Sequence, residues 1–395
     1  MRPEGRFVEA DVCVIGGGPA GLAAALAARR RGLSVVVADR SRPPVEKACG
    51  EGLMPEGVAA LRELGVDVDR TFGMPFRGIR FLEAGLSVEA TFPDGCGLGI
   101  RRLDLHRLLW AKAEDAGVVT IWGSPAERIG ASRVEIAGRT VRCRWIIGAD
   151  GAHSCLRQQA GLPPRWTGLR RIGLRQHFRV PPWTDFVEVY WRHEAQAYVT
   201  PVATDEVCVA VLGGARGGQL ADLGLFPELA KRLGKANRVG PVRGAISMST
   251  RLAKVTRDPF ALIGDASGAV DAVTGEGVSL ALRQALALGQ ALATHDLDVY
   301  ETAHRRMSRL PLLAASVLVH LGAHDAWRRR VLETLAAHPP TFERLLAVHV
   351  GAAGSATGAR GIAGLTLRLI QPRRSLPLAR AIASSEPADL WRPSR

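Results

Sequence analysis

Two short apolar runs near the N-terminus, Val12–Ile15 and Ser34–Ala38, have the length and composition of strands buried on both faces of a parallel sheet. Between them, Ala20–Arg31 is rich in alanine and predicts a well-packed helix. A strand, a helix and a second strand in this order predict a βαβ unit. The chain therefore begins as an α/β protein with a parallel sheet.

Glycines occupy the turn between the first strand and the helix in the pattern G-x-G-x-x-G. Gly16 permits a tight turn, Gly18 lets a diphosphate approach the backbone, and Gly21 lets the helix lie close on the strand. The second strand ends at Asp39, 18 residues after Gly21, where a carboxylate can accept hydrogen bonds from ribose hydroxyls. The pattern predicts a dinucleotide on the positive end of the helix, with NAD and FAD equally open at this point. The residues expected to bind it are Gly16, Gly18, Pro19, Ala20, Gly21, Asp39 and Arg40.

The later apolar pattern predicts a second sheet and a return to the first. Strand-like segments from Arg171 to Leu212 are separated by turn residues, which indicates an antiparallel sheet. Phe260–Ile263 is another buried strand, and Glu276–Ala293 predicts a long helix. We expect a Rossmann-like domain with an inserted antiparallel substrate sheet and a helical C-terminal region. The expected boundaries are 1–165 for the first part of the nucleotide-binding domain with a small hairpin insertion around 75–100, 166–250 for the inserted sheet, 251–300 for the second part and 301–395 for the C-terminal region.

The charge of the chain bears on its partners. The 395 residues carry 52 Lys and Arg against 38 Asp and Glu, a formal net charge of +14. The basic residues are nearly all arginine and lack the clustering and interleaved aromatics of a nucleic-acid surface, so we expect no nucleic-acid partner. Leu310–Leu321 is too short to cross a bilayer. It predicts a core or surface-groove helix, with peripheral membrane contact as the alternative.

The six cysteines show neither a C-x-x-C pair nor metal-ligand spacing, which indicates a reducing compartment and no metal site. The first residues lack the basic-then-apolar order of a secretory signal. We therefore expect a cytoplasmic protein that is membrane-peripheral at most. The sequence does not indicate its oligomeric state.

Three separated motifs together resemble one family of flavoproteins. They are GGGPAG at Gly16–Gly21, GADGAHSCLR at Gly148–Arg157 and GDASGAVDAVTGEG at Gly264–Gly277. In order and separation they are similar to the FAD-dependent superfamily of para-hydroxybenzoate hydroxylase-type monooxygenases, geranylgeranyl reductases and flavin-dependent halogenases. The resemblance implies a FAD-binding domain of the glutathione reductase type and FAD as cofactor. It also implies flavin-binding roles for Arg102, Asp150, Gly151, Asp265, Gly275 and Gly277.

For some of these residues a purely structural role, without flavin binding, is an alternative interpretation. Asp150 and Gly151 also fit a simple strand-ending turn. Arg102 also fits a surface arginine at the start of a helix. For Asp265 the physical reason is stronger, because a carboxylate directly after a buried strand is well placed to hold ribityl hydroxyls. Gly275 and Gly277 flank the start of a helix, whose N-terminus stabilises the negative charge of a reduced flavin by up to ~2 kcal/mol.

The resemblance leaves several reactions open, because the flavin carries the chemistry. We expect first a monooxygenase that hydroxylates a hydrophobic aromatic or polyketide-like small molecule through a flavin C4a-hydroperoxide, as in secondary metabolism. NADPH or NADH would be the transient electron donor. The alternative is a geranylgeranyl reductase-like enzyme that reduces isoprenoid or other carbon–carbon double bonds. A non-catalytic flavin-binding partner is the second alternative, and halogenation ranks last because the paired-tryptophan motif is missing.

The segment EKACGEGLMP at Glu46–Pro55 resembles the cysteine-glycine motif of the reductase branch, with Glu51 in place of a usual glycine. The resemblance implies that Cys49 lies near the flavin ring as a catalytic candidate. A small buried residue without a chemical role is the alternative. The aromatic substrate motif of the reductases is reduced here to Tyr198–Pro201, which counts against that branch.

Residues on the substrate side can only be nominated from the inserted sheet, and we nominate His177, Trp191 and Tyr198. His177 could serve as a general base, although an exposed strand histidine is commoner. Alternation along the strand places Tyr190 and Trp191 on opposite faces, so only one of them can face a flavin.

Overall fold

The two apolar runs at the N-terminus lie side by side in a parallel sheet, as their composition predicts. The computed structural model describes residues 7–68, 72–214 and 223–352. In the first sheet the strand order is β19-β20-β11-β1-β2-β8, with β10 and β9 added beside β11. The strands are β1 (Phe7–Ile15), β2 (Val35–Asp39), β8 (Val119–Trp122), β9 (Ala126–Ile129), β10 (Arg133–Ile136), β11 (Arg139–Gly148), β19 (Thr256–Arg257) and β20 (Phe260–Leu262).

Three helices pack with this sheet, and their small or apolar residues allow close contact. They are α1 (Pro19–Arg29), α3 (Arg102–Asp115) and α6 (Gly277–Ala293). The strands β20, β11, β1, β2 and β8 are mutually parallel, so their carboxyl ends meet at one edge. In open sheets of this kind the cofactor binds at that edge.

The second sheet has the order β17-β13-β16-β15-β14-β5-β6. Its strands are β5 (Gly78–Glu83), β6 (Leu86–Thr91), β13 (Arg171–Arg179), β14 (Phe186–Arg192), β15 (Ala195–Ala203), β16 (Glu206–Gly213) and β17 (Asn237–Ser247). The hairpin β5–β6 belongs to this sheet rather than to the nucleotide-binding part in which the sequence analysis placed it. It joins through β5 and β14, which pair in parallel, so the sheet is antiparallel except at this pair. One edge of β5 would be unpaired in an isolated hairpin, and here it pairs with β14. Strands so far apart in the sequence give no local signal of their pairing.

Short elements connect the two sheets. Small sheets are formed by β3 (Gly52–Leu53), β7 (Gly97–Gly99) and β4 (Met74–Phe76), and by β12 (Pro164–Thr167) and β18 (Thr250–Leu252). The remaining helices here are α2 (Pro55–Glu63), α4 (Cys155–Gln159) and α5 (Pro227–Leu233), with 3₁₀ turns at Leu223–Leu225, Gly264–Ser267 and Ala272–Thr274.

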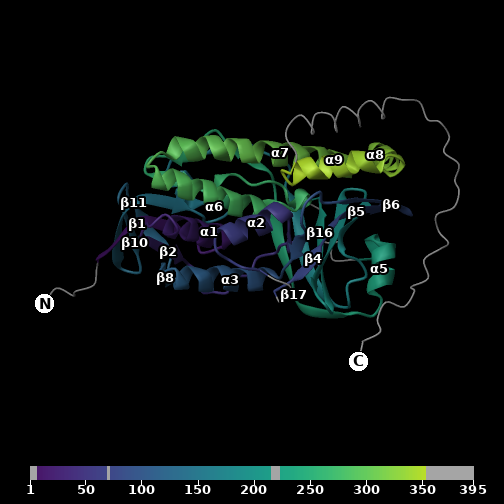
Figure 1. Cartoon of the computed structure of the whole chain (residues 1–395), viewed down its shortest axis with the longest axis horizontal. Coiled ribbons are helices and arrows are strands. Elements are labelled where there is room, and N and C mark those ends of the chain that lie inside the picture. The colour runs from purple at the N-terminus through teal and green to yellow at the C-terminus, as the bar shows by residue number, and fades with distance from the viewer. Residues whose placement is uncertain (1–6, 69–71, 215–222, 353–395) are drawn as a thin grey trace.

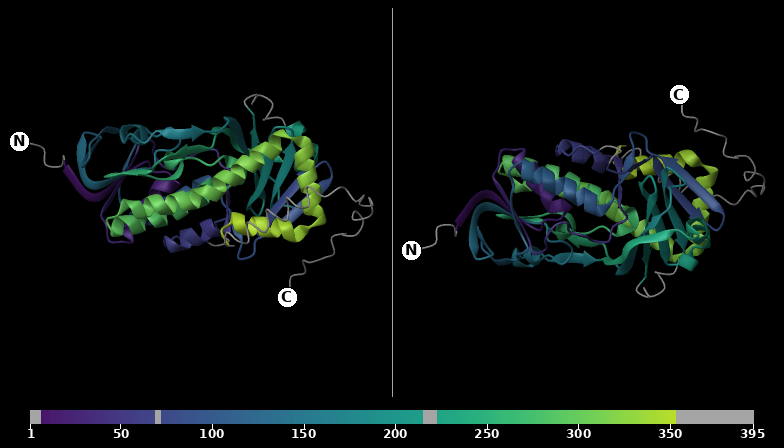
Figure 2. Two further views of the ribbon diagram at one scale, coloured as in Figure 1. Left: turned by 90° about the horizontal axis from the view of Figure 1, so that it is seen from above. Right: turned by 90° about the horizontal axis from the view of Figure 1, so that it is seen from below.

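The C-terminal helices form a layer that runs over both sheets. They are α7 (Leu297–Ala323), α8 (Asp325–Ala337) and α9 (Pro339–His349), and α7 crosses from the first sheet to the second (Figures 1 and 2). The apolar run Leu310–Leu321 lies inside α7, where Leu313 and Val317 remain about half exposed. No helix within the described ranges is both long and apolar enough to span a membrane. The expected helical region beyond residue 352 lies outside the described residues.

Helices α1 and α6 touch almost backbone to backbone. A Cβ atom added at Gly289 of α6 would lie 2.8 Å from Cβ of Ala27 in α1, and one added at Gly264 would lie 2.8 Å from Cβ of Ala20. The Gly264 position also lies 3.9 Å from Cβ of Ala281, in the first turns of α6. Contacts therefore progress from the start of both helices toward their ends, so the helices run in the same direction with their N-termini side by side.

We expect Gly289→Val to destabilise the protein by about 1–3 kcal/mol, because the new side chain overlaps the α1 backbone. Chemical denaturation measures the change in the free energy of unfolding. The matched control is Gln290→Val, one residue further on an exposed face of the same helix. Equal stability of the two variants would contradict the close contact.

Candidate functional site

The glycine-rich turn after β1 has the geometry that its sequence pattern predicts. Gly16 has a φ of +112°, and a Cβ on it would lie 2.3 Å from the carbonyl oxygen of Ala149. A Cβ on Gly21 would lie 1.8 Å from the carbonyl oxygen of Gly16. At Gly18, by contrast, the nearest atom to such a Cβ is Nη2 of Arg102, 4.0 Å away. The first and third glycines thus serve packing, and the second leaves an opening at the N-terminus of α1.

Asp39 lies at the end of β2 beside this turn. Its Oδ2 accepts a hydrogen bond of 2.7 Å from the amide of Gly17, and its Oδ1 accepts one of 2.7 Å from Ser41. Pro19 is the first residue of α1, where its missing N–H costs nothing. Arg40 follows with an exposed side chain. The carboxylate of Asp39 therefore holds the glycine turn, and its role in ribose binding stays a prediction.

Arg102 supplies a buried positive charge next to the opening at Gly18. It is the first residue of α3, and its Nη1 is buried with no hydrogen-bond partner among the described residues. Burial lowers the pKa of its guanidinium. An arginine that lacks a paired anion, next to a helix N-terminus, fits the diphosphate of a dinucleotide. The sequence alternative of a surface arginine is wrong, because the side chain is only 9% exposed.

The second motif follows β11 and forms a capped turn. Oδ2 of Asp150 accepts hydrogen bonds from the amides of Cys155 (2.7 Å) and Leu156 (3.2 Å) at the start of α4. Its Oδ1 is buried without a partner in the part of the chain that the structure describes. Gly151 has a φ of +83°, which favours glycine. Oδ2 of Asp150 thus caps the start of α4, whereas Oδ1 accepts no hydrogen bond from the described residues.

Arg157 connects the second motif with the third. Its guanidinium donates hydrogen bonds to the carbonyl oxygens of Ala152 (2.7 Å) and Ala266 (3.3 Å). These two carbonyls lie more than a hundred residues apart in the sequence. The second and third of the three motifs therefore meet in space through the side chain of Arg157.

Asp265 and the two later glycines lie around the start of α6. Asp265 is in the 3₁₀ turn after β20 and forms an ion pair of 2.8 Å with Lys47, both side chains being partly exposed. Gly275 has a φ of +70°, with Cε of Met54 3.3 Å from its Cβ position. The Cβ position of Gly277 has open space around it. The N-terminus of α6 is thus accessible, next to a carboxylate that can bind hydroxyl groups.

The segment around Cys49 lies against the second sheet. Thr200 Oγ1 donates a hydrogen bond of 2.8 Å to the carbonyl oxygen of Gly50, and the thiol of Cys208 contacts the carbonyl oxygen of Cys49 at 3.8 Å. The side chain of Cys49 is partly buried, and burial raises the pKa of its thiol. Cys49 therefore stays a neutral thiol at physiological pH.

Glu51 stands where the related motif usually has glycine, and the contacts of its side chain compensate for the loss of that glycine. Its φ is +61°, a left-handed conformation that costs energy for a residue with a Cβ. Its buried carboxylate accepts hydrogen bonds from the amide of Arg102 (3.1 Å) and from Nε2 of His177 (2.6 Å). Nε of Arg175 lies 3.9 Å away. These two hydrogen bonds and the nearby positive charge of Arg175 offset the backbone strain and fix the segment between the two sheets.

The tautomer of His177 follows from its neighbours. Nη1 of Arg175 lies 2.9 Å from Nδ1 of His177, and a guanidinium only donates, so Nδ1 is the acceptor. Nε2 then carries the proton that is donated to Glu51. His177 is buried with both ring nitrogens engaged, so it is not the exposed strand histidine that the sequence favoured. It acts as a positioning residue for the Cys49 segment.

One ligand atom from each of Glu51, His177 and Cys208 lies within 4.8 Å of the others. The donor set does not suit a metal ion. Nε2 of His177 is protonated, burial raises the pKa of the Cys208 thiol well above its usual value, and Arg175 adds a positive charge.

The other two substrate-side candidates, Tyr198 and Trp191, lie in different parts of the molecule. The hydroxyl of Tyr198 donates to the carbonyl oxygen of Val273 (2.8 Å), two residues before Gly275. Trp191 is buried against Phe81 with Arg328 of α8 over its ring. Tyr190 packs on the opposite face of the sheet, as the alternation predicts. The structure thus brings His177 and Tyr198 toward the two segments that flank the start of α6, and places Trp191 under α8.

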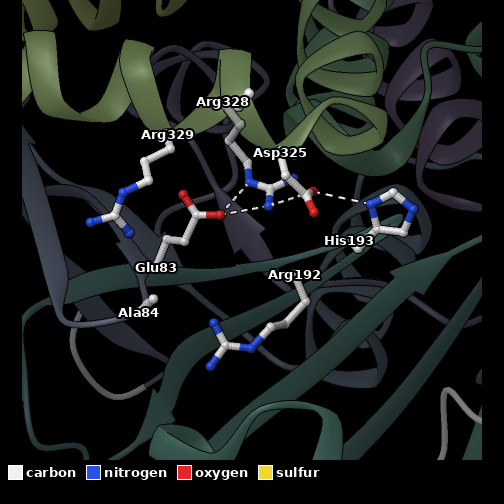
Figure 3. A pocket seen from close by; sticks show the side chains of 8 residues that line it. Glu83, Ala84, Arg192, His193, Asp325, Arg328 and Arg329 are labelled. Carbon is white, nitrogen blue, oxygen red and sulfur yellow. Dashed lines mark hydrogen bonds and ion pairs between the residues drawn. The ribbon is translucent and has the colours of Figure 1, made fainter.

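A charged hollow of about 490 Å³ lies beside α8, away from all the nominated residues except Trp191 (Figure 3). Glu83 pairs with Arg328, Arg328 pairs with Asp325 at 2.8 Å, and His193 lies 3.1 Å from Asp325. Its charges largely pair with one another. We therefore place the candidate site at the carboxyl edge of the first sheet.

Sequence reasoning missed Glu51, Arg175 and Cys208 as members of this site. Glu51 was seen only as a departure from glycine, and the other two lie in strands whose pattern indicates burial alone. Their contacts join residues more than 120 positions apart in the sequence, and no local signal reports such pairs.

Residues 9–122 and 127–303 match the family model described as FAD binding domain. The chain belongs to this family and is a FAD-dependent oxidoreductase with a mixed α/β fold. The buried unpaired Arg102, the glycine turn and the two adjacent helix N-termini fit FAD.

Individual proteins agree with this assignment. The chain is 31% identical over 318 residues to the menaquinone reductase of Mycobacterium tuberculosis, covering 73% of this chain and 78% of the relative. It is 31% identical over 190 residues to the 6-methylpretetramide 4-monooxygenase of Streptomyces rimosus, covering 41% and 43%. The flavin-dependent brominase Bmp2 superposes with a TM-score of 0.76 at 19% identity, covering 91% and 99%, which shows a shared fold.

We expect Arg102→Met to weaken FAD binding roughly tenfold to a hundredfold, because a hydrogen-bonded charge pair is worth about 1.5–3 kcal/mol. Titration of the apo-protein with FAD, followed by flavin fluorescence, measures the affinity. Arg107→Met, an exposed position of the same helix, is the control. Equal affinities in the two variants would rule out a phosphate-binding role for Arg102.

A second substitution pair tests Asp265. If its carboxylate binds flavin hydroxyls, Asp265→Ala lowers FAD affinity by about tenfold, while Lys47→Met, which removes only its partner, has a smaller effect. If the two variants lose the same affinity, Asp265 serves only to hold Lys47. Isothermal titration with FAD distinguishes the two results.

Proposed function

We propose that this oxidoreductase reduces a carbon–carbon double bond in an apolar, isoprenoid-bearing or quinone-type substrate. The position of Cys49, a neutral thiol on a segment fixed against the second sheet, is the observation that carries the proposal. The menaquinone reductase alignment supports it, because it covers about three quarters of both chains. This reverses the order of the sequence analysis, which put hydroxylation first.

Bound FAD would supply the hydride for such a reduction. The chain itself has to supply a proton for the other carbon. Because burial raises the pKa of Cys49, its Sγ–H is a proton donor rather than a nucleophile. The thiolate left by this transfer would regain its proton from solvent, and Lys47 and Arg102 nearby lower the cost of that charge. Thr200 and Glu51 hold the backbone on both sides of the cysteine.

The apolar character of the substrate is inferred from the buried apolar cluster that packs next to the site. Met54 lies beside Gly275 and belongs to the same apolar cluster as Phe76 and Val189, which Tyr198 also contacts. These side chains offer few hydrogen bonds, so they suit a hydrocarbon or an aromatic ring. NADPH or NADH remains the proposed electron donor.

We expect Cys49→Ala to slow substrate reduction by about a hundredfold or more, because a general acid usually contributes ~10²–10⁴-fold. The FAD-loaded protein is reduced with NADPH without oxygen, and its reoxidation by menaquinone or a geranylgeranyl lipid is followed by absorbance. FAD affinity and the rate of reduction by NADPH stay unchanged. Cys96→Ala, at an exposed cysteine, is the control. Unchanged reoxidation by substrate in Cys49→Ala would reject the acid role.

Hydroxylation is the second candidate, supported by the shorter alignment with the monooxygenase. The two reactions differ in their need for oxygen. Substrate-dependent oxygen consumption, equal in wild type and Cys49→Ala, would favour the monooxygenase. A protein that binds FAD and turns over in neither assay would be a non-catalytic partner.

A further inference from the structure

The N-terminus of α6 carries a buried acid that the proposed reaction does not use. Glu276 is the N-cap residue of α6 and is only 2% exposed. Its Oε2 has no hydrogen-bond partner within the described residues. An N-cap acid usually uses its oxygens on the amides of the first turn, but here the side chain does not.

Groups from two other helices surround this carboxyl. Nδ1 of His349, the last residue of α9, lies 3.6 Å from Oε2 of Glu276. Glu56, in the first turn of α2, also has a buried Oε2 without a partner in the described part of the chain. The charge of Glu276 raises the pKa of Glu56, and Arg283 of α6 acts in the opposite direction on the pKa of both acids. The cluster is thus two acids, one histidine and one arginine from α2, α6 and α9.

The electrostatics of the cluster favour proton binding. Burial raises the pKa of Glu276 to about 8 and that of Glu56 to about 7, and Arg283 only partly opposes this. Burial also lowers the pKa of His349, so this ring is neutral at physiological pH and does not neutralise an ionised acid. Around neutral pH the pair of acids therefore holds at least one proton.

The position of the cluster relative to the cofactor follows from the helix packing. Because α1 and α6 run in the same direction with adjacent N-termini, a dinucleotide bound with its diphosphate at α1 would have the start of α6 beside it. Reduction adds negative charge to the flavin, which the positive end of α6 stabilises. An ionised Glu276 at that same helix end would oppose the charge, whereas the neutral acid would not.

We propose that Glu276, with Glu56, forms a proton-binding site that is coupled to the oxidation state of the bound flavin. Two electrons and one proton give the negatively charged reduced flavin. A second proton, taken from solvent, neutralises the carboxylate of Glu276, and it returns to solvent when the flavin is oxidised. This inference rests on FAD being the cofactor and not on which substrate is reduced.

The test counts protons per flavin. FAD-loaded protein is reduced with dithionite at pH 8.5 in weak buffer without oxygen, and proton uptake is read from an indicator dye after correction for dithionite. The wild type should take up close to two protons per flavin at pH 8.5 and close to one at pH 6.5, where Glu276 is already neutral. Glu276→Gln, which keeps the shape of the neutral acid, should take up one at both pH values. The control Glu63→Gln, at the exposed end of α2, should behave as wild type.

A second readout does not depend on FAD. In the folded apo-protein Glu276 and Glu56 keep protons that the unfolded chain releases above its usual carboxyl pKa of about 4.5. The folded state then binds more protons than the unfolded state, so stability falls as pH rises from about 5 to about 8. Glu276→Gln should flatten this fall, as measured by chemical denaturation at several pH values.

The outcomes separate this inference from the proposed function. If the wild type fails to bind FAD, the proposed function fails. If FAD binds and the pH dependence of stability flattens as expected, but wild type and Glu276→Gln take up equal numbers of protons, the coupling is rejected while the oxidoreductase assignment stands. An infrared difference spectrum should also gain the carbonyl band of a protonated carboxyl on reduction at pH 8.5. Persistence of that gain in Glu276→Gln would assign the proton elsewhere and overturn the proposal.

Discussion

The close parallel packing of α1 against α6 is the constraint on which the rest of the site depends. It requires glycine at position 289 and at position 264, because even a methyl group there would overlap the neighbouring helix. The result is that two helix N-termini lie side by side at the carboxyl edge of one sheet. The residues that we expect to bind the cofactor are gathered there. The buried Arg102 lies at one end and the open turn at Gly277 at the other.

The second sheet completes the site through a few charged contacts. The segment around Cys49 spans the gap between the two halves of the molecule, and Glu51 binds both of them, Arg102 on one side and His177 on the other. A left-handed glutamate would be unfavourable alone, but its buried carboxylate accepts hydrogen bonds from the Arg102 amide and the His177 ring, and the positive charge of Arg175 lies 3.9 Å away. The strain and the ion network therefore depend on each other. Loss of either would leave the cysteine without a fixed position.

Sequence reasoning succeeded where a local pattern has one structural solution. The glycines of the first turn, the acid after β2 and the strands of both sheets each follow from spacing or periodicity, and the structure has them as predicted. It failed where the outcome depends on distant partners. The β5–β6 hairpin was placed in the wrong half because its pattern says that it is a hairpin, not which edge it joins. His177 was read as exposed because a polar residue in a strand gives no sign of a buried acid facing it.

The positions of positive groups and buried acids around the helix N-termini bear directly on flavin reduction. Positive groups and helix ends gather at the carboxyl edge of the first sheet, and such groups would lower the cost of the negative charge that reduction adds to a bound flavin. Buried acids lie close to the same helix ends, and without a proton they would cancel part of that effect. Glu51 resolves the conflict with hydrogen bonds from the Arg102 amide and from His177, whereas Oε2 of Glu276 has no hydrogen-bond partner within the described residues and burial raises its pKa to about 8. Whether a hydrogen-bond donor is close enough to replace water thus separates the two buried glutamates: partners hold the carboxylate of Glu51, whereas Oε2 of Glu276 is left available to a proton.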